Sequence, residues 1–491
     1  MDFLKALTYN PNYLLIYQSV LFILVFSVFY SIYLLVFPRP KARNILLLLF
    51  SLYFYYKLSG LFVILLVLVA SCDFLIGRAM LATPSAAKKK GLMMLSVFIN
   101  LGILVFFKYA NFLLGLIFGI FSEPAPWVVD VLMPIGISYY IFKTLTYTLD
   151  IYREEIDKAE SSYWNYLLFV SFFPNILAGP ISRARDLLPQ FSARFSLSRE
   201  MIGKGLFLIL SGAFKKIVIA DMLGANLVVR VFESPEYFNG FEILMAGYAN
   251  LVQLYFDFSG YTDMVIGIAL LLGFNILPNF NKPFLAQNLT DFWRRWHMTL
   301  SSWLRDYLFS PLSVSMRRAG TTGLVIAVMI TFILCGFWHD ALWTFIVWGC
   351  LHAIALGWDI ATNKARTKFK KKNKGAWYKV ISIVLTFHFL MFTFIVFSAD
   401  SLEKAWFLIT RIFTQTDFTL AGAWAEMYLI PLIVLVAGLL LHYLPMKWVD
   451  GARNTFVRLH WTLKVLAVAA AVFAIYQAFS TEAQAFKYLE F

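Results

Sequence analysis

The stretch LLIYQSVLFILVFSVFYSIYLLVF occupies residues 14–37 and holds 24 residues without a single charged side chain. About 20 apolar residues in a helix are enough to cross the hydrocarbon core of a bilayer. We predict that this stretch spans a membrane and is not a detachable leader, because no basic region precedes it and no small-residue cleavage site follows it before Pro38. A membrane protein is therefore the fold class to test against the rest of the chain.

The composition of the whole chain agrees with such a span. Of its 491 residues 60% are hydrophobic and only 14% are charged, whereas soluble proteins carry about 25% charged residues. We therefore expect an all-α polytopic integral membrane protein with about 11–13 membrane helices. Several apolar stretches are short and broken by Gly and Pro, which indicates tilted or re-entrant helices. The predicted apolar spans are residues 14–37, 45–56 joined to 61–76, 92–107, 112–121, 128–149, 164–177, 202–232, 241–272, 324–337, 341–356, 380–397, 427–443 and 465–479.

Polar residues are spread unevenly along the chain. Most of those that are costly inside a membrane lie in residues 134–360, and they are functional candidates because each must be hydrated, paired or placed in a cavity. We divide the chain into N-terminal membrane helices (1–125), a central core (126–400) and a C-terminal part (401–491). This last part begins with an amphipathic stretch, SLEKAWFLITRIF, and holds the last two membrane helices.

Basic residues decide the predicted orientation. They follow the first span at Arg39, Lys41 and Arg43, recur at Lys88–Lys90, and are densest in NKARTKFKKKNK, residues 363–374. By the positive-inside rule these loops are cytoplasmic, which places both termini on the extracytoplasmic side. The last cluster could also bind anionic lipid or an acidic carrier, although a solvated, orienting run of charge is the simpler interpretation.

The net charge of +14 is thus mostly explained by topology. No soluble segment is long enough to form a basic face with interleaved aromatic residues, so we expect no nucleic-acid partner. Cys72, Cys335 and Cys350 all lie in apolar spans, without a CxxC pair or a Cys/His cluster of zinc spacing. Neither a disulfide framework nor a metal site is expected.

Two histidines are candidate catalytic residues. His297 lies in DFWRRWHMTLSSWLRDYLFSPL (291–312), among tryptophans and arginines, and His352 lies in an otherwise apolar predicted helix, one turn after Trp348. Both also have a plain structural interpretation. A lone helical histidine is usually a satisfied core residue, and a histidine in an amphipathic aromatic segment can lie at the membrane interface.

Proton abstraction from a hydroxyl group is the chemistry that suits these residues. A neutral imidazole is a suitable base near pH 7, and burial favours the neutral form. The chain has no GxSxG motif, so a covalent serine intermediate is not expected. Direct attack of a hydroxyl on an acyl thioester needs only a base, an oxyanion donor and a dry tunnel.

Five stretches resemble consecutive motifs of the membrane-bound O-acyltransferase (MBOAT) superfamily, in the bacterial branch of alginate O-acetyltransferase and the teichoic-acid D-alanine transfer protein. They occur in the order of the family and cover about residues 130–400. Lys143, Ala353 and Ser398 depart from the family's motifs, which usually have Gln, Gly and Arg there. The five stretches are FFPNILAGPISRARDLLPQF, GAFKKIVIADML, YFDFSGYTDMVIGIALLLGFNILPNFNKPF, DFWRRWHMTLSSWLRDYLF and GFWHDALWTFIVWGCLHA.

The resemblance implies a ring of tilted helices around a central funnel or tunnel, with two histidines near its constriction. The family's catalytic histidine matches His352 in the LHA step, and its second histidine matches His297 in WRRWHMTL. In such enzymes an acyl thioester on coenzyme A or an acyl carrier protein approaches from the cytoplasm, and the acyl group leaves on the outer side. This thioester is a co-substrate, and no bound cofactor is expected.

Other residues of the same segment receive supporting roles. Arg294 and Arg295 are expected to hold the phosphates of the donor at the inner mouth of the funnel, with positive-inside anchoring as the alternative. Trp293 and Trp296 are expected to anchor the segment at the membrane interface. Arg305 and Asp306 are expected to pair locally. Tunnel-lining or supporting residues are expected to be Trp296, Trp348, Asp306 and Asn281.

The sequence therefore predicts an O-acyltransferase of the bacterial cytoplasmic (inner) membrane. It would move an acyl group, most simply acetyl, to a hydroxyl of a cell-envelope polysaccharide, directly or through an extracytoplasmic SGNH-type partner, with His352 as general base. Two alternatives stay open. One is a transporter or flippase whose polar pathway is gated by histidines, although the spans show no repeat symmetry. The other is acylation of a lipid or a secreted protein.

Overall fold

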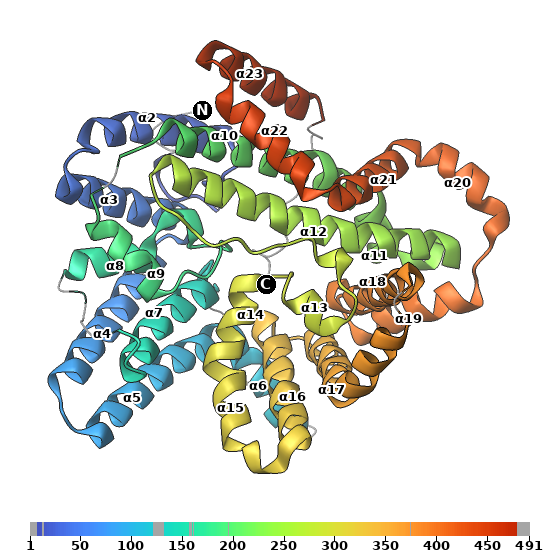
Figure 1. The fold of residues 1–491 in the computed structure, drawn as a ribbon, viewed down its shortest axis with the longest axis horizontal. Coiled ribbons are helices and arrows are strands. Elements are labelled where there is room, and N and C mark those ends of the chain that lie inside the picture. The colour runs from blue at the N-terminus through green and yellow to red at the C-terminus, as the bar shows by residue number, and fades with distance from the viewer. Residues whose placement is uncertain are drawn as a thin grey trace. The chain divides into compact units, whose positions relative to one another are not determined.

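The structure is a computed structural model that describes residues 7–11, 14–120, 132–156, 160, 162–194, 196–373 and 375–478. Over these residues the chain is built from helices and contains no β-strand (Figure 1). This confirms the predicted all-α class. Several predictions fall outside the described residues: the boundary between residues 125 and 126, the ends of the spans 112–121, 128–149 and 465–479, Lys374, and the orientation of the two termini.

The chain divides into two compact units, Met1–Gly205 with Val265–Leu277, and Leu206–Met264 with Pro278–Phe491. The three-part division expected from the sequence stays a prediction. The first unit contains α2 (Val20–Val36), α3 (Pro40–Ser59), α4 (Phe62–Ala82), α5 (Ala86–Leu104), η1 (Val105–Tyr109), α6 (Ala110–Ile120), α7 (Ile137–Tyr152), α8 (Tyr163–Ser171), η2 (Phe173–Asn175) and α9 (Ala184–Ser192).

Two helices, α10 (Arg199–Ala213) and α12 (Gly240–Leu271), contribute to both units. The second unit otherwise contains η3 (Phe214–Asp221), η4 (Gly224–Val228), α11 (Val229–Glu233), η5 (Pro235–Tyr237), η6 (Pro283–Leu285), α13 (Leu289–Trp293), α14 (Met298–Leu304), η7 (Arg305–Phe309), α15 (Ser310–Ser315), η8 (Arg317–Ala319), α16 (Gly320–His339), α17 (Trp343–Lys372), α18 (Ala376–Ser398), α19 (Leu402–Thr414), η9 (Phe418–Leu420), α20 (Ala421–Met427), α21 (Leu429–Tyr443), α22 (Met446–Arg458) and α23 (Trp461–Ala478).

Six helices in the described residues are long and apolar enough to cross a membrane. A bent pair, Phe418–Met427 and Leu429–Tyr443, would add a seventh and turns through 94°. The shorter apolar helices Val20–Val36 and Trp461–Gln477 do not reach the same length, so the larger expected number of about 11–13 stays a prediction. The six are Phe62–Ala82, Ala86–Gly119, Gly240–Leu271, Arg317–His339, Trp343–Lys372 and Ala376–Ser398. The protein is thus a multi-pass membrane protein.

One predicted interruption is absent, because residues 92–107 and the described part of 112–121 belong to one continuous run, Ala86–Gly119. Lys108 interrupts the apolar pattern but not the helix, which continues through the π-helical turn η1. A π-turn adds one residue within a helix without ending it. A charged residue inside an apolar run was therefore a poor marker of a helix end here.

The helix in the predicted span 164–177 ends six residues early, at a break of the kind expected where apolar stretches contain Gly and Pro. α8 ends at Ser171, and a fully buried irregular segment leads to α9. Its polar groups are satisfied by side chains: Asn175 Nδ2 donates to the Pro180 carbonyl (3.2 Å) and to Ser182 Oγ (2.7 Å). Lys143 Nζ donates to Asn175 Oδ1 (3.0 Å) and to the Val170 carbonyl (3.2 Å). Such pairing is what permits irregular backbone in a buried place.

In the second unit, a charged cluster lies where η3 meets α12. The buried Lys216 Nζ is 2.7 Å from Oδ1 of both Asp221 and Asp257. Close contact of the helices makes this possible, because a Cβ added to Gly260 would lie 2.6 Å from the carbonyl oxygen of Gly212. Small residues at such crossings let two backbones approach.

The hairpin of α16 and α17 positions the candidate site. These two helices cross closely at Gly336 and Gly349: a Cβ on Gly349 would lie 2.6 Å from the Phe332 carbonyl oxygen, and one on Gly336 would lie 2.3 Å from that of Phe345. Backbone atoms cannot move aside as a flexible side chain can. Glycine at both positions therefore permits the contact that fixes α17.

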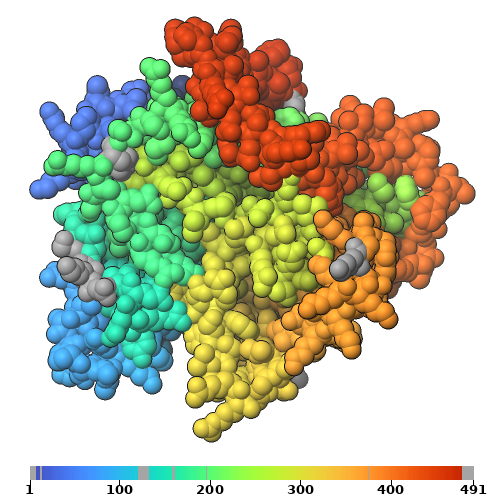
Figure 2. Space-filling model, in the orientation of Figure 1, coloured from blue at the N-terminus to red at the C-terminus, as the bar shows by residue number. Residues whose placement is uncertain are grey.

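Two amphipathic helices lie at the surface of the second unit. α19 confirms the amphipathic stretch predicted from residue 401, because Ala405 and Leu408 are buried while Trp406 and Phe413 are 69% and 71% exposed. α22 has no buried residue. Figure 2 shows this C-terminal segment, in red, at the surface.

Candidate active site

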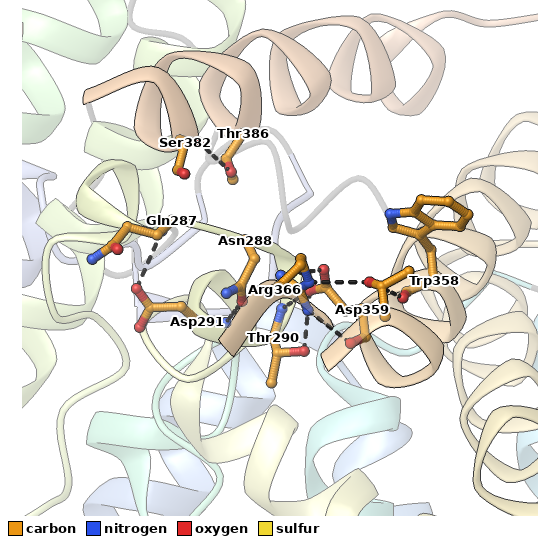
Figure 3. Close-up of polar contacts among 10 residues, drawn as sticks. Gln287, Asn288, Thr290, Asp291, Trp358, Asp359, Arg366, Ser382 and Thr386 are labelled. Atoms are coloured by element: carbon orange, nitrogen blue, oxygen red, sulfur yellow. Dashed lines mark hydrogen bonds and ion pairs between the residues drawn. The ribbon is translucent and has the colours of Figure 1, made fainter. Parts of the chain in front are cut away.

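Asp359 ties the short helix α13 to α17. Its Oδ2 accepts hydrogen bonds from the backbone N–H (3.0 Å) and the hydroxyl (3.2 Å) of Thr290, at the start of α13. Its Oδ1 pairs with Arg366 Nη1 at 3.1 Å, about two helix turns further along α17. Figure 3 shows Asp359 between these two partners. Because α17 also carries His352, the tie sets the position of α13 relative to that histidine.

His352 is fully buried and is hydrogen-bonded through both ring nitrogens. Trp293 Nε1, at the end of α13, lies 3.3 Å from Nδ1, and Thr393 Oγ1, on α18, lies 3.2 Å from Nε2. An indole N–H can only donate, so Nδ1 accepts, and a neutral imidazole then carries its hydrogen on Nε2. Thr393 passes its own hydrogen to the Leu390 carbonyl at 3.1 Å. The basic lone pair of His352 is therefore on Nδ1.

Aromatic rings surround this imidazole. The ring centroid of Trp348 lies 4.6 Å from that of His352, and those of Trp293 and Phe389 each lie 5.6 Å away. The Trp348 side chain is buried, and its indole N–H has no hydrogen-bond partner among the described residues. Such walls exclude water, which strengthens every electrostatic interaction inside them.

His297 combines backbone strain with an unsatisfied side chain. It is the N-cap of α14 with φ 41°, a left-handed conformation that is uncommon for histidine, and the residue is only 1% exposed. Its ring packs edge-on against Phe258 of α12, with centroids 4.8 Å apart. Neither ring nitrogen has a partner among the described residues. Buried polar groups are rarely left in this state, and strain of this kind clusters at functional sites.

Asn279 holds the two residues that follow this strained position. Its carbonyl accepts from the Met298 N–H at 2.9 Å, and its Oδ1 accepts from the hydroxyl of Thr299 at 2.6 Å. The N–H of Ser301 donates to the His297 carbonyl at 2.9 Å and closes the first turn of α14. The unusual φ of His297 is thus imposed by its neighbours.

A cationic pocket of about 720 Å³ opens beside α13 and the second half of α17. Two of its cations are neutralised: Arg295 Nε lies 2.8 Å from Asp291 Oδ1, and Arg366 pairs with Asp359. Three others, Arg294, Lys364 and Lys370, line the pocket without an ion pair in the described part of the chain. The remaining lining residues include Gln287, Asn288, Thr290, Thr321 and Asn363.

The other predicted residues lie in different surroundings. Arg305 and Asp306 pair at 2.8 Å, as expected, on the exposed side of η7. The Asn281 side chain is exposed, and only the backbone of this residue takes part, its N–H donating to the Arg295 carbonyl at 2.9 Å. Trp293 and Trp296 are buried in the protein, at 6% and 2% exposure, rather than exposed as interface anchors. Trp293 packs against Trp348 and His352, and Trp296 packs against Phe292 and Phe394, so both indoles are enclosed by other side chains.

Comparison with known proteins bears on these positions. The model of the MBOAT, membrane-bound O-acyltransferase family matches residues 149–401. The chain is 35% identical over 415 residues to a probable alginate O-acetylase AlgI of Azotobacter vinelandii, covering 83% of this chain and 80% of the relative. It is also 33% identical over 392 residues to a peptidoglycan O-acetyltransferase of Helicobacter pylori, covering 75% and 73%. A teichoic acid D-alanyltransferase of Bacillus subtilis is 31% identical over 272 residues, covering 54% and 68%.

The chain belongs to the membrane-bound O-acyltransferase family. It is therefore a membrane acyltransferase, and an acyl donor is its co-substrate. The matched region contains His297, His352 and Thr393. Within this MBOAT protein, a series of aromatic contacts links the two histidines. Between ring centroids, His297 lies 4.8 Å from Phe258, Phe258 lies 5.1 Å from Phe280, and Phe280 lies 5.1 Å from Trp296. Phe292 then lies 5.4 Å from Trp296 and 6.4 Å from His352.

Sequence reasoning missed three residues of this site. Thr393 lies on a helix whose sequence is otherwise typical of a lipid-facing span, so nothing marked its hydroxyl. Asn279, by contrast, is a buried amide in an apolar stretch and carried the same signal that marked the histidines. Asp359 lies on the same helix as His352, two turns further on. The signal that could have identified it is an acidic residue at the end of an apolar run.

Proposed function

We propose that this protein transfers an acetyl group from a cytoplasmic thioester to a hydroxyl of a cell-envelope polysaccharide, with His352 as the general base. One observation supports the chemistry above all: the buried imidazole of His352 is held by Trp293 and Thr393 in a defined tautomer with its lone pair on Nδ1. The similarity to a probable alginate O-acetylase and to a peptidoglycan O-acetyltransferase supports the acetyl group and the polymer.

In the proposed step the acceptor hydroxyl replaces the Trp293 indole N–H at Nδ1 of His352. Nδ1 takes the hydroxyl proton while the hydroxyl oxygen attacks the thioester carbonyl carbon. The C–S bond then breaks, and the leaving thiolate receives the proton from the imidazolium. The exchange at Nδ1 costs little, because a hydrogen bond of 3.3 Å is long and weak.

His297 would assist this step rather than perform it. Its two ring nitrogens are free of partners among the described residues, so the imidazole can donate to a substrate oxygen or relay a proton. Rigid placement makes such a donor effective, since no reorganisation is needed when charge develops. The bonds of Asn279 to Met298 and Thr299, the two residues that follow His297, supply that rigidity.

The donor would bind in the cationic pocket. Arg294, Lys364 and Lys370 offer unpaired charge for the phosphates of coenzyme A or of the prosthetic group of an acyl carrier protein. Asn363, in the same pocket, lies eleven residues beyond His352 on α17, which is roughly 16 Å along the helix axis. An extended pantetheine arm could bridge this separation and bring the thioester to the histidine.

The remaining parts of the proposal concern topology. The basic cluster at residues 363–374 would be cytoplasmic, both termini extracytoplasmic, and the membrane the bacterial cytoplasmic one. A ring of helices around a tunnel would carry the acyl group outward. An SGNH-type partner would receive it on the outer side near α19, whose exposed Trp406 and Phe413 could contact that partner or the lipid interface.

The test is to identify the acetylated product. Membranes that contain the protein receive radiolabelled acetyl-CoA or acetyl-loaded acyl carrier protein, and the label is followed into polysaccharide, lipid and protein fractions. We expect alkali-labile label in the polysaccharide fraction. Label confined to lipid or protein would contradict the proposed acceptor, and ion-driven solute flux without any acyl product would favour a transporter.

A further inference from the structure

A second cationic pocket lies in the first unit, and none of its lining residues belongs to the candidate active site. It encloses about 730 Å³ among the N-terminus of α3, the N-terminus of α8 and the end of α9. Figure 1 shows α8 and α9 next to α3 in that unit. Arg39, Lys41 and Arg194 supply three positive charges to its lining, and no aspartate or glutamate is among the described residues that line it. None of the three makes an ion pair in the described part of the chain.

The walls of this pocket add donors and further positive potential. Beneath it the buried Arg43 donates Nη2 to the Phe191 carbonyl (3.0 Å) and Nε to Asn44 Oδ1 (3.2 Å), which fixes two lining residues. Asn44 Nδ2 also donates to Asn165 Oδ1 at 3.1 Å. The N-cap residue of α3, Arg39, makes no side-chain cap, Pro40 has no N–H, and the N–H of Arg43 donates to the Arg39 carbonyl. The N–H groups of Lys41 and Ala42 therefore remain at the pocket end of this helix. The pocket is thus built for an anion.

The surface next to the pocket is apolar. This favours an amphiphile, which has an apolar part to contact that surface, over a small anion, which has none. Trp164 and Ile45, both in the lining, are 62% and 53% exposed, and Leu49, one turn after Ile45, is 60% exposed. Tryptophan beside cationic residues is typical of the membrane interface. An anion held here would have exposed apolar side chains along one side of it.

That apolar face of α3 leads to a groove between α3 and α4. Ile45, Leu49, Leu52 and Tyr56 follow one another at three- and four-residue spacing, so they form one stripe on the helix. Leu52 and Tyr56 line the groove, of about 540 Å³, with residues 63–68 of α4. Leu52 lies seven residues beyond Ile45, roughly 10 Å along the axis. This distance fits within the roughly 15 Å of hydrocarbon in one leaflet.

We propose that this surface is a binding site for an anionic phospholipid. The headgroup phosphate occupies the pocket of Arg39, Lys41 and Arg194, and one acyl chain follows the stripe on α3 into the α3–α4 groove. The charge of the pocket requires an anionic headgroup, and the stripe requires a chain. Basic pockets beside membrane helices are suited to such headgroups. This site is separate from the acyl-transfer chemistry and does not depend on it.

The test is lipid retention by the full-length purified protein. Phosphatidylglycerol and phosphatidylcholine with identical acyl chains are added in equal amounts to delipidated protein, and the bound lipid is measured by native mass spectrometry. We expect the wild type to prefer phosphatidylglycerol by about tenfold. Arg39→Gln, Lys41→Gln and Arg194→Gln together should reduce this preference to less than about twofold, because roughly a factor of five for each interfacial cation is more than enough to account for the whole preference.

A matched control removes the same charge elsewhere. Lys88→Gln, Lys90→Gln and Lys371→Gln change exposed lysines outside the pocket and should leave the preference as in the wild type. An unchanged preference in the pocket variant would overturn the proposal, as would equal loss in the control.

A substitution in the groove tests the acyl-chain half of the site. Val67→Trp fills the groove with a larger side chain. It should weaken retention of long-chain phosphatidylglycerol several-fold while short-chain phosphatidylglycerol binds as before. Equal retention of both lipids by this variant would contradict the proposed chain path. Displacement of the lipid by millimolar inorganic phosphate would show that the pocket binds small anions, and would also overturn the lipid assignment.

Discussion

At the scale of single residues, a catalytic histidine differs from a merely packed one in the hydrogen-bond donor at its basic ring nitrogen. A substrate must be able to replace that donor. Nδ1 of His352 meets a long hydrogen bond from Trp293, which a substrate hydroxyl can replace, while Nε2 is held by the better anchored Thr393. Thr393 is in turn fixed to the Leu390 carbonyl. Thr393 is therefore a positioning residue, and its effect on the rate should depend on its hydroxyl alone.

Thr393→Val removes that hydroxyl with little change of shape, whereas Thr393→Ser retains it. We expect kcat for acyl transfer to fall roughly 10–100-fold in the valine variant, because the tautomer of His352 is no longer fixed. The serine variant should stay within about threefold of the wild type. Steady-state rates at varied donor concentration check this, and KM for the donor should not change. Equal losses in the two variants would indicate a packing role.

His297 can be tested without disturbing its backbone. Asparagine adopts left-handed φ values more readily than most residues, so His297→Asn should fold as the wild type does while lacking the imidazole. We expect acyl transfer to fall at least about 100-fold. His297→Ala should in addition lose roughly 1 kcal/mol of stability, because alanine is strained at φ 41°. Thermal unfolding and transfer rates together separate the two effects, and full activity of the asparagine variant would exclude a chemical role.

Among the residues of the site, the sequence predicted those that are polar and lie in apolar runs. His297 and His352 were visible because such residues are costly in a membrane. The partnership of Trp293 with His352 was not visible, since it requires α13 to pack against α17, and tryptophan in an amphipathic segment is equally typical of the interface. The difference is one of tertiary contact, which spacing does not encode.

At the scale of helices, the α16–α17 crossing holds the site together. Gly349→Ala would place a Cβ 2.6 Å from the Phe332 carbonyl oxygen and force the two helices apart. We expect a loss of roughly 1–3 kcal/mol in stability and a parallel loss of transfer activity, because His352 lies one turn away. Gly451→Ala is the matched control on α22, where no heavy atom lies within 4 Å. Unfolding of both variants in detergent measures this, and equal stability would contradict the role given to the crossing.

The helix breaks show where sequence patterns hold and where they fail. Prolines and a Gly-Pro step correctly predicted the interruption between α8 and α9, because proline removes a backbone donor. The predicted separation of the spans 92–107 and 112–121, with Lys108 between them, was wrong, since a helix can accommodate a charged residue within a π-turn. The number of membrane crossings is hard to predict for the same reason, because the sequence does not show which short apolar stretches join into one helix.

At the scale of the whole molecule, the affinity for the thioester donor should depend on the summed positive charge of the cationic pocket. Arg294→Gln, Lys364→Gln and Lys370→Gln together should raise KM for the thioester donor about tenfold and make it less dependent on salt, with little change in kcat. A control with Arg317→Gln, Arg318→Gln and Lys371→Gln removes the same charge from exposed positions outside the pocket. Kinetics at two ionic strengths check the prediction. A donor KM that is unchanged in the pocket variant would contradict donor binding there.

The proposal that His352 is the general base is tested most directly by one rate. Membranes with matched amounts of wild type or His352→Gln are given radiolabelled acetyl-CoA, and the initial rate of label entering the cell-envelope fraction is measured. Glutamine fills similar space and keeps a hydrogen bond but cannot accept the proton, so we predict a loss of about 10²–10⁴-fold. A glutamine variant within about threefold of the wild type would contradict the account, and His352 would then be a buried structural histidine.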